Sequence, residues 1–328
     1  MKYRMLGKTG FKISEVSLGT WQLGARWGDK FDDAVAEQSL GRAAELGINF
    51  FDTADVYSDG LSERAIGKAL KKMKERVYAA TKCGRRLKPH TADGYNDRNI
   101  RKFVEDSLRN MALETIDLIQ LHCPPTEVYY RPEVFETLEA LVKEGKIRHY
   151  GVSVEKVEEA LKAIEYPGVA TVQIIFNMFR QRPAELFFEQ ARKRNVGIIA
   201  RVPLASGLLS GMFTKETIFK KGDHRFFNRQ GAFFDRGETF AGLDYDKGLE
   251  AVGELKALFP DHGKLAQYAL RWVLMFREVS CVIPGASGVP QVESNVSASA
   301  LPPLSRRQME KVKDIYQRHF KHDVHHRW

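Results

Sequence analysis

Short apolar runs alternate with longer amphipathic stretches along most of this chain. From residue 17 onward, eight runs have the length of strands, at 17–20, 48–51, 77–81, 116–121, 147–152, 169–175, 197–200 and 280–283. Apolar residues recur at helical spacing between them, most clearly at Ile100, Phe103, Val104 and Leu108. Strands that alternate with helices predict a parallel sheet, and eight of them predict a single-domain (β/α)8 barrel over residues 1–328.

The remaining segments extend this prediction. Two short runs around the turn-rich residues 7–10 predict an N-terminal hairpin. Helices are expected at 32–46, 62–72, 96–111, 132–141, 157–164, 185–194, 247–259, 264–277, 289–300 and, as a tail helix, 305–320. Residues 204–245 lack periodicity, and an irregular span of that length is usually functional or disordered. We expect it to reach over the barrel as a clasp on an anionic ligand, or else to be a mobile loop.

Four polar residues stand at or just after the ends of consecutive predicted strands. Asp52 ends the second strand and Tyr57 lies in the loop after it, while Lys82 and His122 follow the third and fourth strands. The C-terminal ends of parallel barrel strands converge on one rim, where such folds place their chemistry. The four side chains are therefore candidates for one catalytic site.

This set of side chains suits proton transfer to or from an oxygen atom. Free tyrosine titrates near ~10, and a neighbouring ammonium lowers that pKa. We expect Asp52 to hold Lys82 charged, so that Tyr57 can protonate a carbonyl oxygen or deprotonate an alcohol. His122 can orient that oxygen by hydrogen bonding. None of the four is a hydride donor, which implies a redox cofactor.

Longer motifs around these residues resemble the aldo-keto reductases. The matching segments, in the order of the family, are Asn49–Tyr57, Gly60–Glu63, Gly67–Leu70, Lys82, Asp117–His122, Gly151–Ser153 and Ile283–Ala286. The resemblance covers nearly the whole chain. It implies a (β/α)8 barrel plugged at its bottom by the hairpin, and the reduction of aldehydes and ketones with NADPH. It also implies a catalytic tetrad of Asp52, Tyr57, Lys82 and His122.

The cofactor site is expected outside a Rossmann fold, because the chain lacks a G-x-G-x-x-G fingerprint after its first strand. Loops 203–209 and 283–288 can offer backbone N–H groups and a helix N-terminus to a pyrophosphate. By the resemblance, Ser153 and Gln173 hold the nicotinamide carboxamide. The other residues implied in cofactor binding are Thr20, Trp21, Arg201, Leu204, Ser206, Gly207, Gly285, Ser287, Gln291 and Asn295.

Three positions depart from the pattern of the family. Val154 stands where an Asn usually follows Ser153, so one amide contact to the nicotinamide is expected to be lost or replaced. Arg201 replaces the aromatic residue that usually stacks on the ring. A guanidinium can also stack, and we expect its charge to favour the reduced, neutral ring. Ser287 replaces a residue that is often basic and pairs with the 2′-phosphate of NADP(H). Ser287 and Gln291 can hydrogen-bond that phosphate but carry no charge. NADP(H) remains the expected cofactor, with NAD(H) as a second one.

The net charge, the cysteines and the His-rich C-terminal residues do not indicate a further function. Much of the net charge of +9 falls in residues 64–88, which we interpret as a solvated face, because no aromatic-interleaved nucleic-acid module accompanies it. Cys83, Cys123 and Cys281 are too widely spaced for a zinc site or a disulfide framework, so packing is a better interpretation than redox sensing. The His-rich residues 321–328 are expected to be a solvated terminus and not a metal site.

The composition also favours a soluble protein. The hydrophobic fraction of 43% supports a sizeable core, and no apolar run approaches the ~20 residues that span a bilayer. Residues 1–10 are too polar for a secretory signal. We therefore expect a cytoplasmic protein that acts on a small carbonyl compound, without a nucleic-acid or membrane partner. Its oligomeric state and substrate are not predicted.

Two alternatives remain at this point. One is a binding or sensor protein that keeps its cofactor, similar to the potassium-channel beta subunits, which also resemble this tetrad. The other is a metal-dependent hydrolase, which needs several His and carboxylate ligands at strand ends, and only His122 fits that pattern. Trp21, Trp27 and Tyr129 follow predicted strands and either line an apolar substrate pocket or take part in ordinary packing.

Overall fold

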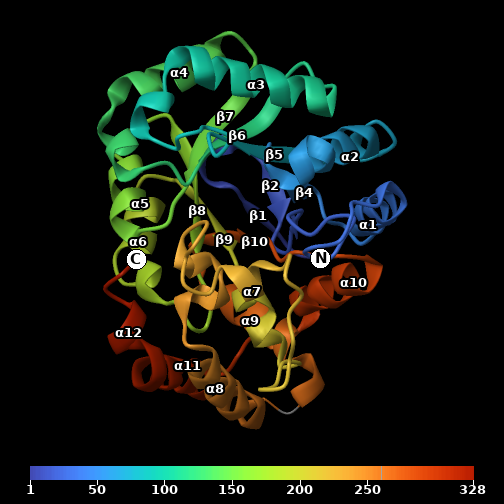
Figure 1. Ribbon diagram of the computed structural model, residues 1–328, viewed down its shortest axis with the longest axis vertical. Coiled ribbons are helices and arrows are strands. Elements are labelled where there is room, and N and C mark those ends of the chain that lie inside the picture. The colour runs from blue at the N-terminus through green and yellow to red at the C-terminus, as the bar shows by residue number, and fades with distance from the viewer. Residues whose placement is uncertain (260) are drawn as a thin grey trace.

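The computed structural model of the protein describes residues 1–259 and 261–328. Eight parallel strands form a barrel whose spatial order follows the sequence (Figure 1). They are β3 (Leu18–Gly19), β4 (Phe50–Asp52), β5 (Tyr78–Cys83), β6 (Ile116–His122), β7 (Ile147–Ser153), β8 (Val169–Ile175), β9 (Gly197–Arg201) and β10 (Val279–Val282). Parallel bridges join Val16 to Val282 and Gly19 to Gly285, so the last strand meets the first. The predicted (β/α)8 barrel is confirmed.

The N-terminal hairpin closes the bottom of the barrel. Strand β1 (Tyr3–Met5) pairs antiparallel with β2 (Lys12–Ser14). Leu6 and Ile13 are fully buried in a cluster with residues of the barrel strands, including Phe50 and Ile199. The Arg4 guanidinium donates to the Val279 carbonyl at 2.8 Å, at the start of β10. The hairpin therefore seals the end opposite the rim, as expected.

Helices surround the strands (Figure 1). Those between strands are α1 (Asp33–Glu45), α2 (Leu61–Leu70), α3 (Asp97–Met111), α4 (Pro132–Lys143), α5 (Val157–Ala163), α6 (Phe187–Lys193), α8 (Tyr245–Leu258) and α9 (Leu265–Val273), and α10 (Val289–Ser297) and α11 (Arg306–Tyr316) follow β10. Polar side chains cap the starts of some of them; for example, the Asp32 carboxylate accepts the N–H groups of Ala34 and Val35. No helix in the described ranges is both long and apolar enough to cross a bilayer.

Residues 204–245 remain irregular, but hydrogen bonds join their two ends. They contain only short turns, namely η6 (Ala205–Ser210), α7 (His224–Phe227), η7 (Arg236–Glu238) and η8 (Phe240–Gly242). In Figure 1, α7 lies in front of the strands. The Ser206 hydroxyl donates to the Glu238 carbonyl at 3.0 Å and accepts the Phe240 N–H at 3.1 Å. These bonds join the beginning of the segment to its end, and we call residues 204–245 the covering segment.

The prediction of a solvated terminus at residues 321–328 holds only in part, because four of these residues are exposed but Val324 and Trp328 are buried. Helix α11 continues through a π turn into α12 (His322–Val324), and Trp328 is only 6% exposed. The Trp328 indole donates to Asp235 Oδ1 at 3.0 Å, and the Arg180 guanidinium lies 4.3 Å from its ring centroid. The large apolar ring is buried because it packs against the covering segment, a contact that local polarity does not reveal.

Candidate active site

A buried ion pair forms the base of the site. Lys82, near the end of β5, is 1% exposed, and its ammonium donates to Asp52 Oδ2 at 2.5 Å and to the Thr53 carbonyl at 2.7 Å. Burial alone lowers the pKa of Lys82, but the Asp52 carboxylate and the Tyr57 phenol outweigh burial and raise it above its usual value. Lys82 is therefore a permanent cation, as expected from the sequence.

Two glutamine side chains hold the other oxygen of Asp52. Gln120 Nε2 donates to Asp52 Oδ1 at 3.0 Å, and Gln173 Nε2 donates to the same atom at 2.8 Å. Gln173 also lies 3.2 Å from Gln120 Oε1. The resemblance implies that Gln173 binds the nicotinamide, but here its amide N–H groups donate to Asp52 and Gln120 at the base of the site. Sequence reasoning missed Gln120, although a fully buried glutamine within an apolar strand is itself a signal.

Tyr57 and His122 face each other above this ion pair. Their ring centroids are 5.9 Å apart in an edge contact, and the Lys82 ammonium lies 5.1 Å from the Tyr57 centroid. Burial raises the pKa of Tyr57 above its usual value, although Lys82 opposes this shift. Lys82 does lower the pKa of Tyr57, as expected, but the increase caused by burial is larger. Burial, together with Arg85 and Lys82, holds the pKa of His122 well below its usual range, so His122 is neutral.

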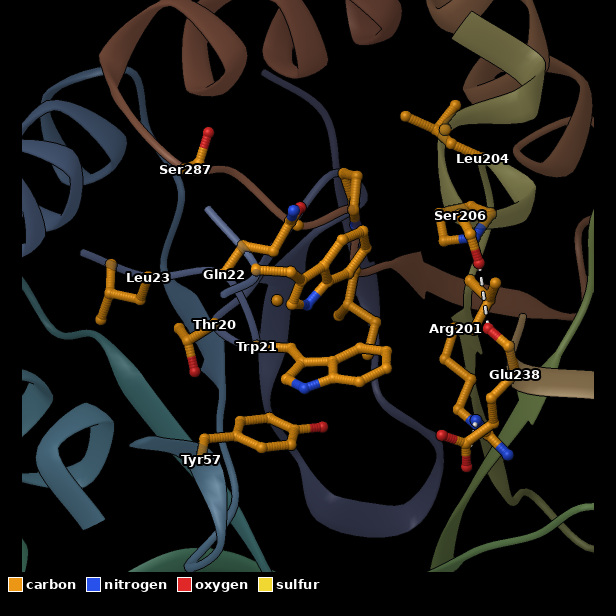
Figure 2. A pocket seen from close by; sticks show the side chains of 18 of the residues that line it. Thr20, Trp21, Gln22, Leu23, Tyr57, Arg201, Leu204, Ser206, Glu238 and Ser287 are labelled. Atoms are coloured by element: carbon orange, nitrogen blue, oxygen red, sulfur yellow. Dashed lines mark hydrogen bonds and ion pairs between the residues drawn. The ribbon is translucent and has the colours of Figure 1, made fainter. Parts of the chain in front are cut away.

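These residues open onto a cavity of about 1110 Å³. Asp52, Tyr57 and His122 line it, and so do most of the predicted cofactor residues, namely Thr20, Trp21, Gln173, Arg201, Leu204, Ser206, Gly207, Gly285, Ser287, Gln291 and Asn295. In Figure 2, Ser287 lies on the wall opposite Leu204 and Ser206. Within the described ranges, Lys82 and Ser153 do not line the cavity. Ser153 is 1% exposed, and its hydroxyl lies 3.5 Å from Cys123 Sγ.

An aromatic group forms one wall of the cavity. Trp21 stacks near Tyr57, with centroids 6.3 Å apart, and meets Trp27 edge-on at 5.2 Å. His224, from α7 of the covering segment, packs against both indoles at 4.8 and 4.2 Å. The covering segment therefore does reach the site. Tyr129, the third aromatic residue considered, is fully buried in the main core and lies outside the lining, so its role is packing.

Charged residues form the wall that faces Trp21 (Figure 2). Arg201 Nη2 lies 2.9 Å from Glu155 Oε2, and Arg201 Nη1 lies 3.3 Å from Glu238 Oε1. Arg85 also pairs with both glutamates, at 3.1 Å to Glu155. We call these four residues the charge quartet. Because Arg201 contacts two carboxyl groups, it does not present the isolated positive charge on which the expected preference for the reduced cofactor rested.

Sequence reasoning missed three members of the charge quartet. Arg85 was assigned to a solvated basic face, yet its side chain is only 21% exposed. It lies two residues after the end of β5, and Glu155 lies two residues after the end of β7 at the same rim, so strand ends were a usable signal for both. Glu238 gave no such signal, since it lies deep in the irregular covering segment. Its position depends on how that segment folds back.

A metal ion does not fit this wall. Ligand atoms of Cys123, Glu155 and Glu238 lie within 4.8 Å of one another. However, the guanidinium groups of Arg85 and Arg201 already contact both carboxyl groups, and a divalent cation would meet two positive charges there. Burial raises the pKa of Cys123 to about 12, so its thiol is protonated and a poor metal ligand. The cysteines are all buried, as the packing interpretation expected.

A closed parallel barrel with a buried ion pair, a tyrosine and a histidine at its rim has the architecture of a barrel enzyme. The chain belongs to the Aldo/keto reductase family, whose profile matches residues 15–317. It is similar to the holo form of an aldo-keto reductase from Bacillus halodurans, with a TM-score of 0.77 and 28% identity over 99% of each chain. A glycerol dehydrogenase from Gluconobacter oxydans gives a TM-score of 0.78 and 30% identity, over 97% of this chain and 96% of that one.

Some relatives bear a different kind of name. A probable voltage-gated potassium channel subunit beta from Arabidopsis thaliana is 27% identical over 97% of each chain. The family thus contains proteins named as dehydrogenases and a protein named as a channel subunit.

Proposed function

We propose that this protein reduces aldehydes and ketones with NADPH, and that Tyr57 is the general acid. The observation that carries the proposal is the placement of Tyr57 between the buried Lys82–Asp52 pair and a neutral His122, at the wall of one cavity. The raised pKa of Tyr57 keeps the phenol protonated at neutral pH, and the lowered pKa of His122 keeps the imidazole uncharged. Those are the states needed to donate a proton and a neutral hydrogen bond.

Each residue then has a defined task. A bound nicotinamide cofactor supplies the hydride. His122 and Tyr57 hydrogen-bond the carbonyl oxygen of the substrate, and Tyr57 transfers its proton as negative charge grows on that oxygen. Lys82 stabilises the phenolate left behind, because Asp52 and the Thr53 carbonyl fix its ammonium below the ring.

The residues present fit a dinucleotide. The cavity of about 1110 Å³ slightly exceeds the ~300–1,000 Å³ typical of small-molecule sites, which leaves room for a cofactor and a small substrate. The N-terminus of α10 lies beside Ser287 and Gln291 of the lining, where the positive end of the helix dipole favours an anionic group. The described lining residues of α10 include no lysine or arginine. We propose NADP(H) as the cofactor, as the resemblance implies, and because no cation among the described residues of α10 is in place to select the 2′-phosphate, NAD(H) is accepted as well.

The test begins with binding. Trp21 and Trp27 line the cavity, so quenching of tryptophan fluorescence by NADPH and NADH reports occupancy directly. The NADPH-loaded protein is then mixed with a panel of aldehydes and ketones, and the cofactor absorbance is followed. Oxidation that depends on the carbonyl compound supports the reductase, whereas a lack of NADPH and NADH binding would overturn the cofactor assignment.

A second candidate is a sensor protein that retains its cofactor. The similarity to a probable channel beta subunit over nearly the whole chain is the observation that favours it. The covering segment, tied down by Ser206 and Trp328, is compatible with slow cofactor release. Tight NADPH binding without oxidation by any carbonyl compound in the panel would support this candidate over the reductase.

A further inference from the structure

Glu155 and Glu238 place two carboxyl groups side by side at the wall of the cavity. Their oxygen atoms lie within 4.8 Å of each other, and the side chains are only 12% and 5% exposed. Glu155 follows β7, whereas Glu238 belongs to η7 of the covering segment. Glu155 Oε2 lies 2.9 Å from Arg201 Nη2 but makes no well-aligned hydrogen bond among the described residues. Two buried carboxyl groups at this separation compete for a single proton.

The groups that face the pair define which of them holds the proton. Arg85 and Arg201 hold the pKa of Glu238 well below its usual range, even though burial opposes this shift. Burial raises the pKa of Glu155 to about 8; Arg201 opposes the shift, and the Glu238 carboxylate adds to it. The pair therefore carries one proton and one negative charge at neutral pH.

Three titratable side chains around the pair, those of Cys123, His122 and Arg180, keep their charge state at neutral pH. Cys123 lies beside Arg201 and has a pKa of about 12, and the pKa of His122 is far below neutrality. Arg180, which donates to the Glu155 carbonyl at 2.6 Å, has a pKa lowered by burial to about 10, so it is a cation at neutral pH and begins to lose its proton only near pH 9.5. Asp235 is held by the Trp328 indole at 3.0 Å.

We propose that the Glu155–Glu238 pair is a proton-binding site that distinguishes the two oxidation states of the cofactor: it keeps its proton beside a reduced nicotinamide and releases it beside an oxidised one. The inference rests on the proposed function. The pair lines the same cavity as Tyr57 and His122, and the charge of Glu238 acts on both. The positively charged ring of an oxidised nicotinamide in this cavity stabilises a second negative charge on the pair, whereas the neutral ring of a reduced nicotinamide does not.

Linkage gives the sign of the effect. If binding of NADP⁺ favours the deprotonated pair, deprotonation must favour NADP⁺ binding by the same factor. The affinity for NADP⁺ should therefore rise as the pH increases through the pKa of Glu155, while the affinity for NADPH should not respond to this group. Because both ligands carry the same phosphates, the ratio of their dissociation constants isolates the nicotinamide. We expect that ratio, Kd(NADP⁺)/Kd(NADPH), to fall about tenfold between pH 6.5 and 9.5, within the common range of coupling factors.

The experiment is a fluorescence titration of the full chain with NADP⁺ and with NADPH across that pH range. Glu155→Gln keeps the shape of the side chain and removes the titrating proton, so the ratio should become flat with pH. Glu105→Gln alters an exposed carboxylate on α3 and is the matched control, which should behave like the native chain. Calorimetry of NADP⁺ binding in buffers of different ionisation enthalpy should show proton release near pH 7.5 in the native chain and not in Glu155→Gln.

Each outcome decides the inference. A ratio that is constant with pH in the native chain, or that falls equally in Glu155→Gln, would overturn the role of the pair although the cofactor assignment would stand. If Glu155→Gln fails to fold, as judged by thermal melting, proton release by the native chain still decides the matter. If neither cofactor binds, the proposed function itself fails.

Discussion

The buried Lys82–Asp52 pair makes a sharp prediction about stability. Asp52→Asn retains the shape of the side chain but removes the negative charge that faces the Lys82 ammonium. The Lys82 side chain is 1% exposed, and its ammonium then keeps only uncharged partners, such as the Thr53 carbonyl. Two unit charges about 3 Å apart at an effective dielectric constant of ~20 attract each other by roughly 5 kcal/mol. A hydrogen bond to the amide oxygen recovers part of this. We therefore expect Asp52→Asn to lower the free energy of unfolding by about 3–5 kcal/mol at pH 7.

The pH dependence of this loss follows from the pKa of Lys82. In the native chain the pKa of Lys82 is raised. The ion pair therefore contributes fully to stability at pH values below the pKa of lysine in the unfolded chain, and this contribution is lost only as the pH rises through the raised pKa. In Asp52→Asn, burial without a counter-charge lowers the pKa of Lys82 in the folded state. The unfolded chain then binds more protons, and stability rises with pH. The deficit of the variant should therefore be smaller at pH 9.5 than at pH 7.

Urea denaturation at both pH values measures these differences. Asp33→Asn is a matched control, because Asp33 pairs with Lys68 at 3.3 Å and both side chains are about 70% exposed. An exposed pair at a helix start contributes less than about 1 kcal/mol. Equal losses for the two variants, or a deficit in Asp52→Asn that does not change with pH, would refute the role of the buried ion pair.

Three further predictions follow from contacts around the site. Gln120→Leu removes a donor to Asp52 Oδ1, so unfolding by urea should become easier by about 1–3 kcal/mol, and single-turnover reduction should slow without a change in the Kd for NADPH. Trp328→Ala removes the ring that packs against Arg180 and Asp235, so limited proteolysis should cut the covering segment faster, and the urea midpoint should fall; unchanged cleavage would contradict the packing role. His224 has a pKa lowered by burial to about 4, so the folded state resists protonation, and stability falls as the pH drops from 6.5 to 4. His224→Gln should reduce that acid loss by roughly 3 kcal/mol in urea melts at pH 7 and pH 4, and an equal loss in both chains would contradict it.

Most of the barrel could be predicted from the local pattern of apolar and polar residues in the sequence. Strands such as β8, buried at every position, appear as continuous apolar runs, and Asp32 or Asn96 marks a helix start through its own side chain. Asp52 and Lys82 were found because strand ends of a parallel barrel converge. These inferences needed only neighbours in sequence and the geometry of one fold.

The parts that were missed depend on contacts between distant segments. Glu238 reaches Arg85 across 153 positions, and Trp328 reaches Asp235 across 93, within stretches that have no periodicity. Burial also reversed one expectation. A lysine beside Tyr57 lowers the pKa of the phenol in isolation, but the desolvation that raises it appears only once the chain has folded.

The most direct test of the account is a single-turnover measurement. The protein is loaded with NADPH and mixed with an aldehyde that the panel has shown to be a substrate, and loss of the cofactor absorbance is followed for three chains. We expect Tyr57→Phe to slow oxidation by about 10²–10⁴-fold with an unchanged Kd for NADPH, because only the acid is removed. Tyr130→Phe, at a 64% exposed tyrosine, should match the native chain. Oxidation by Tyr57→Phe at the native rate would contradict the assignment of Tyr57 as the proton donor.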